Sequence, residues 1–174
     1  MIAAFRNIHP RLDPSVFVAP SATIVGNVEI GAGSSVWFNA VIRADLNDIR
    51  IGERTSVQDN CVLHVDTGER FMRIGNEVTI GHGTVLHGCI IGNQCLIGMG
   101  SVVLNKARIG ECCIVAAGSV VAPGVEVEDH TLLVGVPAKP KRKITEEDLQ
   151  MIRSGVQEYY ELSREYLPLG ANLR

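Results

Sequence analysis

Residues 91–115 read IGNQCLIGMGSVVLNKARIGECCIV, and this stretch decides the fold. An aliphatic residue opens every block of six: Ile91, Ile97, Val103, Ile109, Val115. A small or short side chain recurs four positions after these residues, and glycine often follows them directly, where a turn needs freedom in φ. Each block is therefore predicted to form one short strand and one corner.

The same period extends in both directions along the chain. It covers twenty positions between Leu12 and Leu133, all of them Ile, Val or Leu, and the step departs from six only before Ile51, Ile74 and Ile91. One block cannot bury its apolar face alone, so stacked blocks must share a continuous core. Three blocks close one triangular coil. The sequence therefore predicts an all-β solenoid, whose hand the period does not fix.

Four segments are expected along the chain. Residues 1–11 form an N-terminal lead-in that caps the coil, residues 12–138 the solenoid, residues 139–144 a basic linker, and residues 145–174 a C-terminal helix and tail. Thr145 is a predicted N-cap, with Asp148 three residues later, and apolar residues then recur at helical spacing. We expect this amphipathic helix to lie against the outside of the coil.

Composition narrows the class of protein. A chain of 174 residues with a net charge of −3 and no basic stripe predicts one domain and no nucleic-acid partner. No apolar run approaches a membrane span and no signal peptide is apparent, so neither a membrane nor secretion is expected. Five cysteines without a secretion signal fit a reducing cytoplasm. Cys61, Cys95 and Cys113 share the small inward position, whereas the period does not place Cys89 and Cys112.

Three histidines occupy phased positions in the repeat. Residues of the same phase in neighbouring coils stack about 4.8 Å apart. His64 and His87 follow stacked aliphatic positions directly and share one outward column with Arg43. His82 lies two residues beyond its aliphatic position, in a column with Phe38 and Asp59, and so on a different face. His9 and His130 are expected to be exposed residues near the ends.

This phasing predicts a homotrimer with intersubunit metal sites. Around a three-fold axis, His82 of one chain would meet His64 and His87 of the next. Three imidazoles leave one tetrahedral position open, as in catalytic zinc sites, where bound water becomes a hydroxide nucleophile. Trp37 and Phe38 are expected on an exposed face of the monomer, which also favours burial between subunits. The alternative is three solvated histidines on strands.

Several motifs resemble those of the γ-class carbonic anhydrases and their bacterial relatives. They are RAD at 43–45, VQDN at 57–60, LH at 63–64, GH at 81–82, LHGC at 86–89 and IGMG at 97–100. This resemblance covers nearly the whole chain. It implies a left-handed parallel β-helix, against the usual crossover hand, a homotrimer, and zinc, iron or cobalt held by the three histidines. The implied activity is that of a zinc lyase that reversibly hydrates CO₂ to bicarbonate by a zinc-bound hydroxide.

The same resemblance implies roles for further residues. Gln58 would orient the hydroxide or CO₂. Arg43 and Asp59 would form an intersubunit salt bridge and hydrogen-bond network, with Asp45 beside them, and Tyr159 aligns with a helix tyrosine near that site. The alternatives are an ordinary ion pair for Arg43 and Asp59, corner hydrogen bonding for Gln58 and helix packing for Tyr159.

The chain also departs from the archaeal pattern of this family. Residues 65–73 offer only Asp66 and Glu69 where that type has an acidic loop with a proton-shuttling glutamate, and Leu46 replaces a second glutamate. Because proton export limits fast hydration, we expect a low rate.

Two other functions stay open. GVPAK at 135–139 resembles the exit segment of hexapeptide acyltransferases, which favours acyl-CoA transfer or thioester hydrolysis, and the missing glutamates favour a non-enzymatic metal-binding scaffold.

Overall fold

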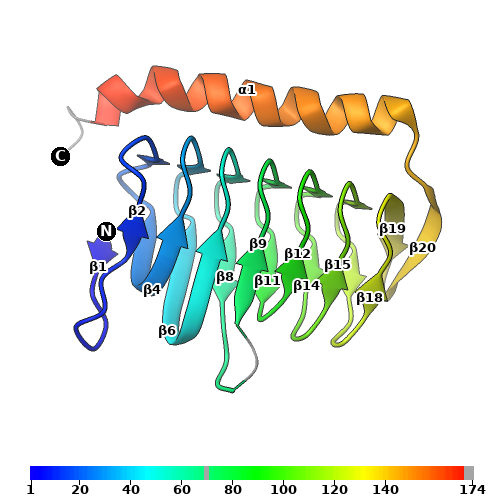
Figure 1. Cartoon of the computed structure of the whole chain (residues 1–174), viewed down its shortest axis with the longest axis horizontal. Helices are drawn as coiled ribbons and strands as arrows, with labels where there is room; N and C mark the ends of the chain where they lie inside the picture. Colours follow the sequence, from blue (N-terminus) through cyan, green and yellow to red (C-terminus); the bar gives the residue numbers. More distant parts are fainter. Residues whose placement is uncertain (69–70, 171–174) are drawn as a thin grey trace.

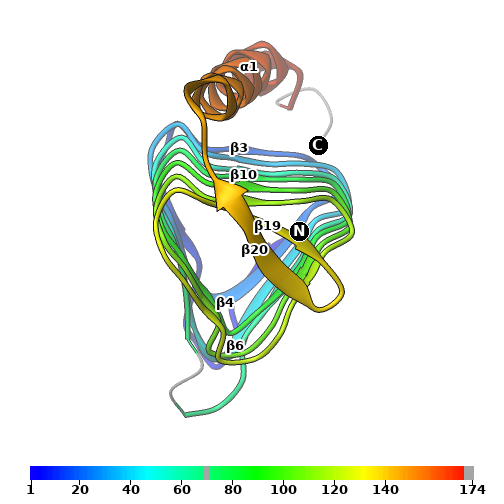
Figure 2. The same cartoon turned by 90° about the vertical axis from the view of Figure 1, so that its right-hand side faces the viewer.

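The chain folds as a parallel β-solenoid with one long helix running beside it (Figure 1). This computed structural model describes residues 1–68 and 71–170. Seen along the coil, the solenoid has a triangular cross-section, with the helix outside one of its three sides (Figure 2). No helix within these described ranges is long and apolar enough to cross a membrane.

The first side, which we call the helix-covered face, is an eight-stranded sheet. Its strands are β3 Phe17–Val18, β5 Ser35–Val36, β7 Ser56–Val57, β10 Thr79–Ile80, β13 Leu96–Ile97, β16 Ile114–Val115, β19 Thr131–Gly135 and β20 Ala138–Lys143. All pairs in it are parallel except β19 with β20, which is antiparallel. Residues 139–144, expected to be a linker, are therefore mostly strand.

The other two sides share a twelve-stranded sheet. One limb contains β8 Val62–His64, β11 Val85–His87, β14 Val102–Val103 and β17 Val120–Val121; the other contains β9 Met72–Ile74, β12 Ile90–Ile91, β15 Arg108–Ile109 and β18 Glu126–Val127. Strands β4 Thr23–Ile30 and β6 Val41–Ile51 are long enough to run through both limbs. Strands β1 Ile2–Ala3 and β2 Arg11–Leu12 pair with β4, so the expected lead-in already forms part of the first coil.

The core confirms the repeat. All of the predicted aliphatic positions except Leu12 and Val18 are buried. Those that occupy the same place in neighbouring coils are register partners, as Leu63 and Leu86 are. The thiols of Cys61, Cys95 and Cys113 lie inside the same core. Because every coil stacks its aliphatic side chain on the next, the apolar area removed from water runs through the whole solenoid and is the main favourable term in its folding.

Helix α1, Glu146–Gly170, begins at a capping box. The Thr145 Oγ1 accepts a hydrogen bond from the backbone N–H of Asp148, and the Asp148 carboxylate accepts one from the backbone N–H of Thr145. This arrangement satisfies two N–H groups at the start of the helix. The helix buries Ile152 and Val156 against the solenoid.

The position of Trp37 corrects one prediction. Its side chain is 3% exposed within a single chain, because α1 covers it. Tyr159 and Tyr166 of the helix meet the Trp37 ring edge-on, with centroids at 5.4 and 5.3 Å. The neighbouring Phe38 is also partly buried, and its ring meets that of Tyr166 edge-on. Burial of these rings therefore gives no argument for an oligomer.

Candidate metal centre

His64 and His87 stand side by side on the face built by β8 and β11. Their Cα atoms are register partners, and Arg43 of β6 continues the same column, as the repeat predicts. The His64 Nδ1 and His87 Nε2 atoms are 3.1 Å apart. The two side chains are partly exposed, so a ligand or a neighbouring chain can reach them.

Each ring of this pair has a further partner. The His87 Nδ1 lies 2.7 Å from the Asn105 Oδ1, and since that oxygen only accepts, the proton belongs on Nδ1 and the lone pair on Nε2. The His64 Nε2 lies 3.0 Å from the Asp45 Oδ1, and Arg43 binds the same carboxylate. Burial raises the pKa of Asp45, but the hydrogen bonds from His64 and Arg43 outweigh it and lower that pKa.

These partners turn the remaining ring nitrogens of the pair toward each other. If Asp45 accepts the proton of His64 Nε2, the Nδ1 of a neutral His64 and the Nε2 of His87 present lone pairs to each other at 3.1 Å. Two such lone pairs attract either a proton or a metal ion, and imidazole nitrogens suit zinc. Asn105 and Asp45 would then be the outer partners that fix ligand orientation in metal sites. The donor set fits the expected ion.

His82 belongs to a second cluster at another corner. Its Nδ1 lies 2.8 Å from the Asp59 Oδ2, and its Nε2 lies 3.2 Å from the Tyr159 hydroxyl of α1. Its backbone N–H donates to the Gln58 Oε1 at 3.1 Å. Burial, with Asp59 nearby, raises the pKa of Tyr159, so the phenol stays protonated and donates to His82. The lone pair of His82 therefore lies on Nε2, where it accepts this hydrogen bond.

The eight predicted site residues thus form two clusters within one chain. One contains Arg43, Asp45, His64 and His87, and the other contains Gln58, Asp59, His82 and Tyr159. His82 precedes the strand that His87 ends, so up to five residues of extended chain, about 16 Å, separate them. Within the described parts of the chain, no three His, Cys, Asp or Glu side chains gather closely enough to hold an ion.

Sequence reasoning missed Asn105 as a partner of His87. The signal was present, because position 105 lies 18 residues, one regular coil, after position 87. Arg43 and Asp59, which the resemblance pairs across subunits, bind Asp45 and His82 within the chain. Of the expected acidic groups after the first histidine, Glu69 lies outside the described residues.

The comparisons agree with this architecture. The family model of the GMPPB C-terminal domain matches residues 46–152. Among solved structures, a hexapeptide transferase family protein from Anaplasma phagocytophilum has a TM-score of 0.92 and 38% identity, covering 95% of this chain and 98% of that one. The six-residue repeat and the triangular coil thus define a protein of the hexapeptide-repeat class.

Comparison with curated relatives identifies the family within the hexapeptide-repeat class. A carbonic anhydrase from Geobacillus kaustophilus is 40% identical over 169 residues, which cover 97% of this chain and 92% of that protein. Gamma carbonic anhydrase 2 from Arabidopsis thaliana mitochondria is 38% identical over 160 residues, 89% of this chain and 58% of the plant protein. The chain therefore spans little more than half the length of the plant relative. It belongs to the γ-class carbonic anhydrase family of hexapeptide-repeat proteins.

Proposed function

We propose that this protein is a metal-dependent enzyme that reversibly hydrates CO₂ to bicarbonate, as a homotrimer of left-handed coils with a site at each subunit boundary. One observation carries the proposal: a pair of histidines and a lone histidine lie at opposite edges of the same uncovered face. Neither group completes a three-ligand site in one chain. Two chains placed edge to edge would complete it.

The uncovered face carries an apolar column beside the histidine column, and we call it the valine face. Its outward column contains one valine from each of five coils: Val41, Val62, Val85, Val102, Val120. Val62 is 40% exposed, and the helix lies over a different side of the triangle (Figure 2). Contiguous exposed apolar surface of this kind marks an interaction site. Turning three valine faces toward a common axis brings the His82 edge of each subunit against the His64 and His87 edge of the next.

The ion would be held by His64 and His87 of one subunit and the equivalent of His82 from its neighbour. Zinc is the expected ion, with iron and cobalt as alternatives that imidazole ligands also accept. When bound by three imidazoles, zinc keeps one coordination position open and acidifies water there, as in carbonic anhydrases generally.

The chain's own groups prepare the ligands. Asn105 and Asp59 hold the Nδ1 protons of His87 and His82, which places both lone pairs on Nε2. The Tyr159 hydroxyl, which donates to the Nε2 of His82, would turn away from it when the ion binds. Gln58 is 4% exposed, and its Oε1 already accepts the backbone N–H of His82. Its amide N–H₂ would therefore be the group that donates to an oxygen of CO₂ or bicarbonate and orients it. Tyr159 adds a hydroxyl donor beside His82.

The turnover is proposed to be low. Leu46, which replaces a glutamate of the archaeal type, is 46% exposed and carries no proton-transfer group. Proton export from the site would therefore depend on solvent and buffer rather than on a dedicated side chain. External buffer should accelerate hydration more strongly here than in a relative that has both glutamates.

The direct experiment combines metal content with activity. Anaerobically purified protein should contain one metal ion per chain by elemental analysis, and stopped-flow measurements should detect CO₂ hydration. His82→Ala should lose both, because only two ligands remain at each site. Metal-replete protein that hydrates CO₂ no faster than the His82→Ala variant would refute the proposed activity.

Subunit complementation tests the shared site separately. His82→Ala and His87→Ala chains should each bind no metal as homotrimers. After co-refolding in equal amounts, random mixing of subunits should restore about a quarter of the sites, those that join an intact pair to an intact His82. A mixture that stays metal-free would contradict a site shared between chains, even if the wild-type protein contains metal.

A second candidate is acyl transfer or thioester hydrolysis on coenzyme A derivatives. It is favoured by the likeness to the Anaplasma hexapeptide transferase family protein, which extends over nearly the full length of both chains. A panel of acyl-CoA substrates distinguishes the two functions. Product formation that depends on acyl-CoA and survives in His82→Ala would favour transfer with a single histidine as base, whereas its absence would leave CO₂ hydration.

A further inference from the structure

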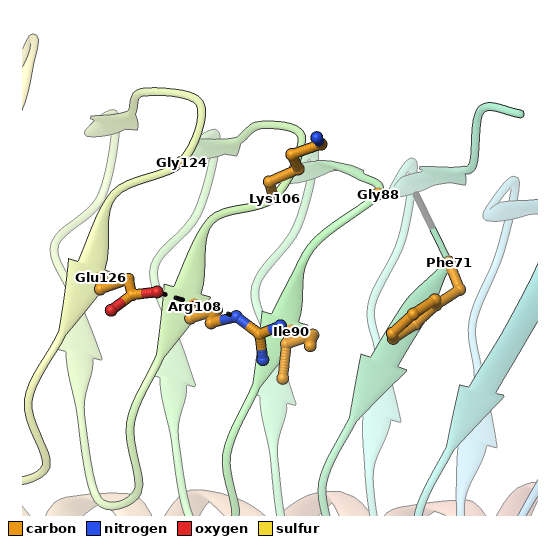
Figure 3. Close-up of a pocket in the computed structure, with 7 residues that line it drawn as sticks. All are labelled: Phe71, Gly88, Ile90, Lys106, Arg108, Gly124 and Glu126. Atoms are coloured by element: carbon orange, nitrogen blue, oxygen red, sulfur yellow. Dashed lines mark ion pairs between the residues drawn. The ribbon is translucent and has the colours of Figure 1, made fainter. Parts of the chain in front are cut away.

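A groove of about 560 Å³ lies where the valine face turns into the third side of the solenoid (Figure 3). That third side is the charged face, whose outward column is Glu29, Arg50, Arg73, Ile90, Arg108 and Glu126. Phe71, Ile90, Arg108 and Glu126 line the groove from the charged face, and Gly88 and Lys106 line it from the corner. None of these residues has a role in the proposed metal chemistry.

The groove carries an excess of positive charge. Lys106 is exposed, and within residues 1–68 and 71–170 its ammonium group has no ion-pair partner. Arg108 and Glu126 approach each other at 4.0 Å, with side chains 58% and 79% exposed, so this pair is weak and readily exchanged. Among the described residues that line the groove, two cations thus stand against one carboxylate. A ligand with a single negative charge would balance the lining.

The remaining lining is apolar. Ile90 lies beside Arg108, and the Phe71 ring stands on the neighbouring strand, whereas the Lys106 ammonium group lies at the corner and points away from Arg108 (Figure 3). The Arg73 guanidinium lies 4.5 Å from the centroid of the Phe71 ring and helps to hold it. The volume falls in the range of sites that bind organic ligands, and it is far larger than bicarbonate requires.

We propose that this groove binds an organic monocarboxylate with an apolar tail, its carboxylate on Arg108, its tail along Ile90 and Phe71, and the exposed Lys106 side chain turning inward to meet the carboxylate. The site adjoins the candidate metal centre, because Gly88 follows His87 and Lys106 follows Asn105, which binds His87. It goes beyond CO₂ hydration and does not depend on that function. No metal ion takes part in it.

The test is calorimetric titration of the intact protein with hexanoate. Hexanoate should bind, and added salt should weaken its binding because two exposed cations hold the carboxylate. Hexanamide, which has the same tail without the charge, should bind at least about tenfold more weakly, the effect of roughly one lost charged contact. Hexyl phosphate and coenzyme A serve as the phosphate arm and should bind more weakly than hexanoate.

Variants of opposite expected effect separate binding from misfolding. Lys106→Gln with Arg108→Gln should weaken hexanoate binding about tenfold or more. Glutamine is compatible with the backbone at 106, where φ is 64°, because Gln94 adopts 52° at an equivalent corner. Glu126→Gln should strengthen binding severalfold by freeing Arg108. Lys139→Gln, which removes an exposed lysine that does not line the groove, is the matched control and should leave the affinity unchanged.

Several results would overturn the proposal. The first is no detectable binding of hexanoate at about 10 mM. The second is equal binding by the wild type and the glutamine double variant. The third is tighter binding of hexyl phosphate than of hexanoate. His82→Ala should bind hexanoate like the wild type. If His82→Ala loses metal and keeps hexanoate binding, the two sites are independent, so failure of either proposal can be recognised separately.

Discussion

The helix-covered face and the valine face are built from the same repeat, yet they differ in their outward side chains and in what covers them. Both turn aliphatic side chains inward, as Val57 and Leu63 do, and both are sheets of short parallel strands. On the helix-covered face the outward column combines apolar residues such as Phe17 and Ile114 with small polar ones, Ser35, Ser56 and Thr79. They let α1 approach and are buried beneath it. The valine face presents apolar side chains that α1 does not cover.

The difference separates two functions of the repeat. Inward residues determine the coil, and they are alike on all sides. Outward residues determine what covers each side: the protein's own helix, solvent over the charged face, or, as we propose, two further copies of the chain. The predictions below alter one face while leaving the other as a reference.

Charge placed on the valine face should have the largest effect. Val62→Glu combined with Val85→Glu would put carboxylates into the proposed subunit boundary, where burying them unpaired is costly. The mass by light scattering should fall from three times 18.8 kDa to 18.8 kDa, and bound metal should be lost. Val134→Glu is the matched control, because Val134 is 42% exposed and lies outside the valine face. A trimer that survives the double change would remove the valine face as the interface.

Loss of the aromatic packing under α1 should come next. Trp37→Ala removes the ring that Tyr159 and Tyr166 contact, and the free energy of unfolding should fall by about 3–5 kcal/mol, the usual cost of deleting a buried aromatic side chain. Urea unfolding at a fixed protein concentration measures it. Met151→Ala, on the exposed side of the helix, should change stability by less than about 0.5 kcal/mol. Equal effects of the two changes would show that α1 contributes little to stability.

Acid should weaken the start of α1 by a smaller amount. Hydrogen bonds from Arg142 and Thr145 hold the pKa of Asp148 well below its usual value. A carboxylate with a lowered folded-state pKa stabilises the fold fully above its unfolded pKa, and this contribution is lost as the pH falls through the folded value. The stability gap between wild type and Asp148→Asn should thus be constant near neutrality and shrink below about pH 4. Thermal melts followed by circular dichroism measure it. A gap unaffected by acid would exclude the capping carboxylate as its cause.

The cysteines should show the smallest response. All five are free, and four of them are buried in the core, which the inward phase predicted for three. Burial raises the pKa of Cys61 to about 11 and that of Cys89 to about 12, so these thiols stay protonated and unreactive near neutral pH. Native protein should be labelled by a thiol reagent at Cys112 alone, and at all five cysteines after unfolding. Rapid native labelling of Cys89 would contradict the described core.

The cytoplasmic location, which we expected from five cysteines without a secretion signal, stays a prediction.

The candidate site was partly predictable from the sequence. The stacking of His64 and His87, and the separation of His82 from them, follow from counting coils, because neighbouring coils repeat the same phase. Asn105 was accessible to the same count but was missed. The contact between Tyr159 and His82 follows from family resemblance and not from the period, since the two residues are 77 positions apart and meet only when the helix folds back.

The sequence by itself determined the coil, because a six-residue period of aliphatic residues leaves stacked strands as the way to bury them all. Only the tertiary structure decided which side of the triangle the helix covers. The helix buries Trp37 within one chain and leaves the valine column without cover from α1, and residues 138–143 pair with β19 as a strand. The physical reason is that local periodicity specifies which residues point inward, whereas the docking of a distant helix depends on the shape of a surface that exists only after the coils have stacked.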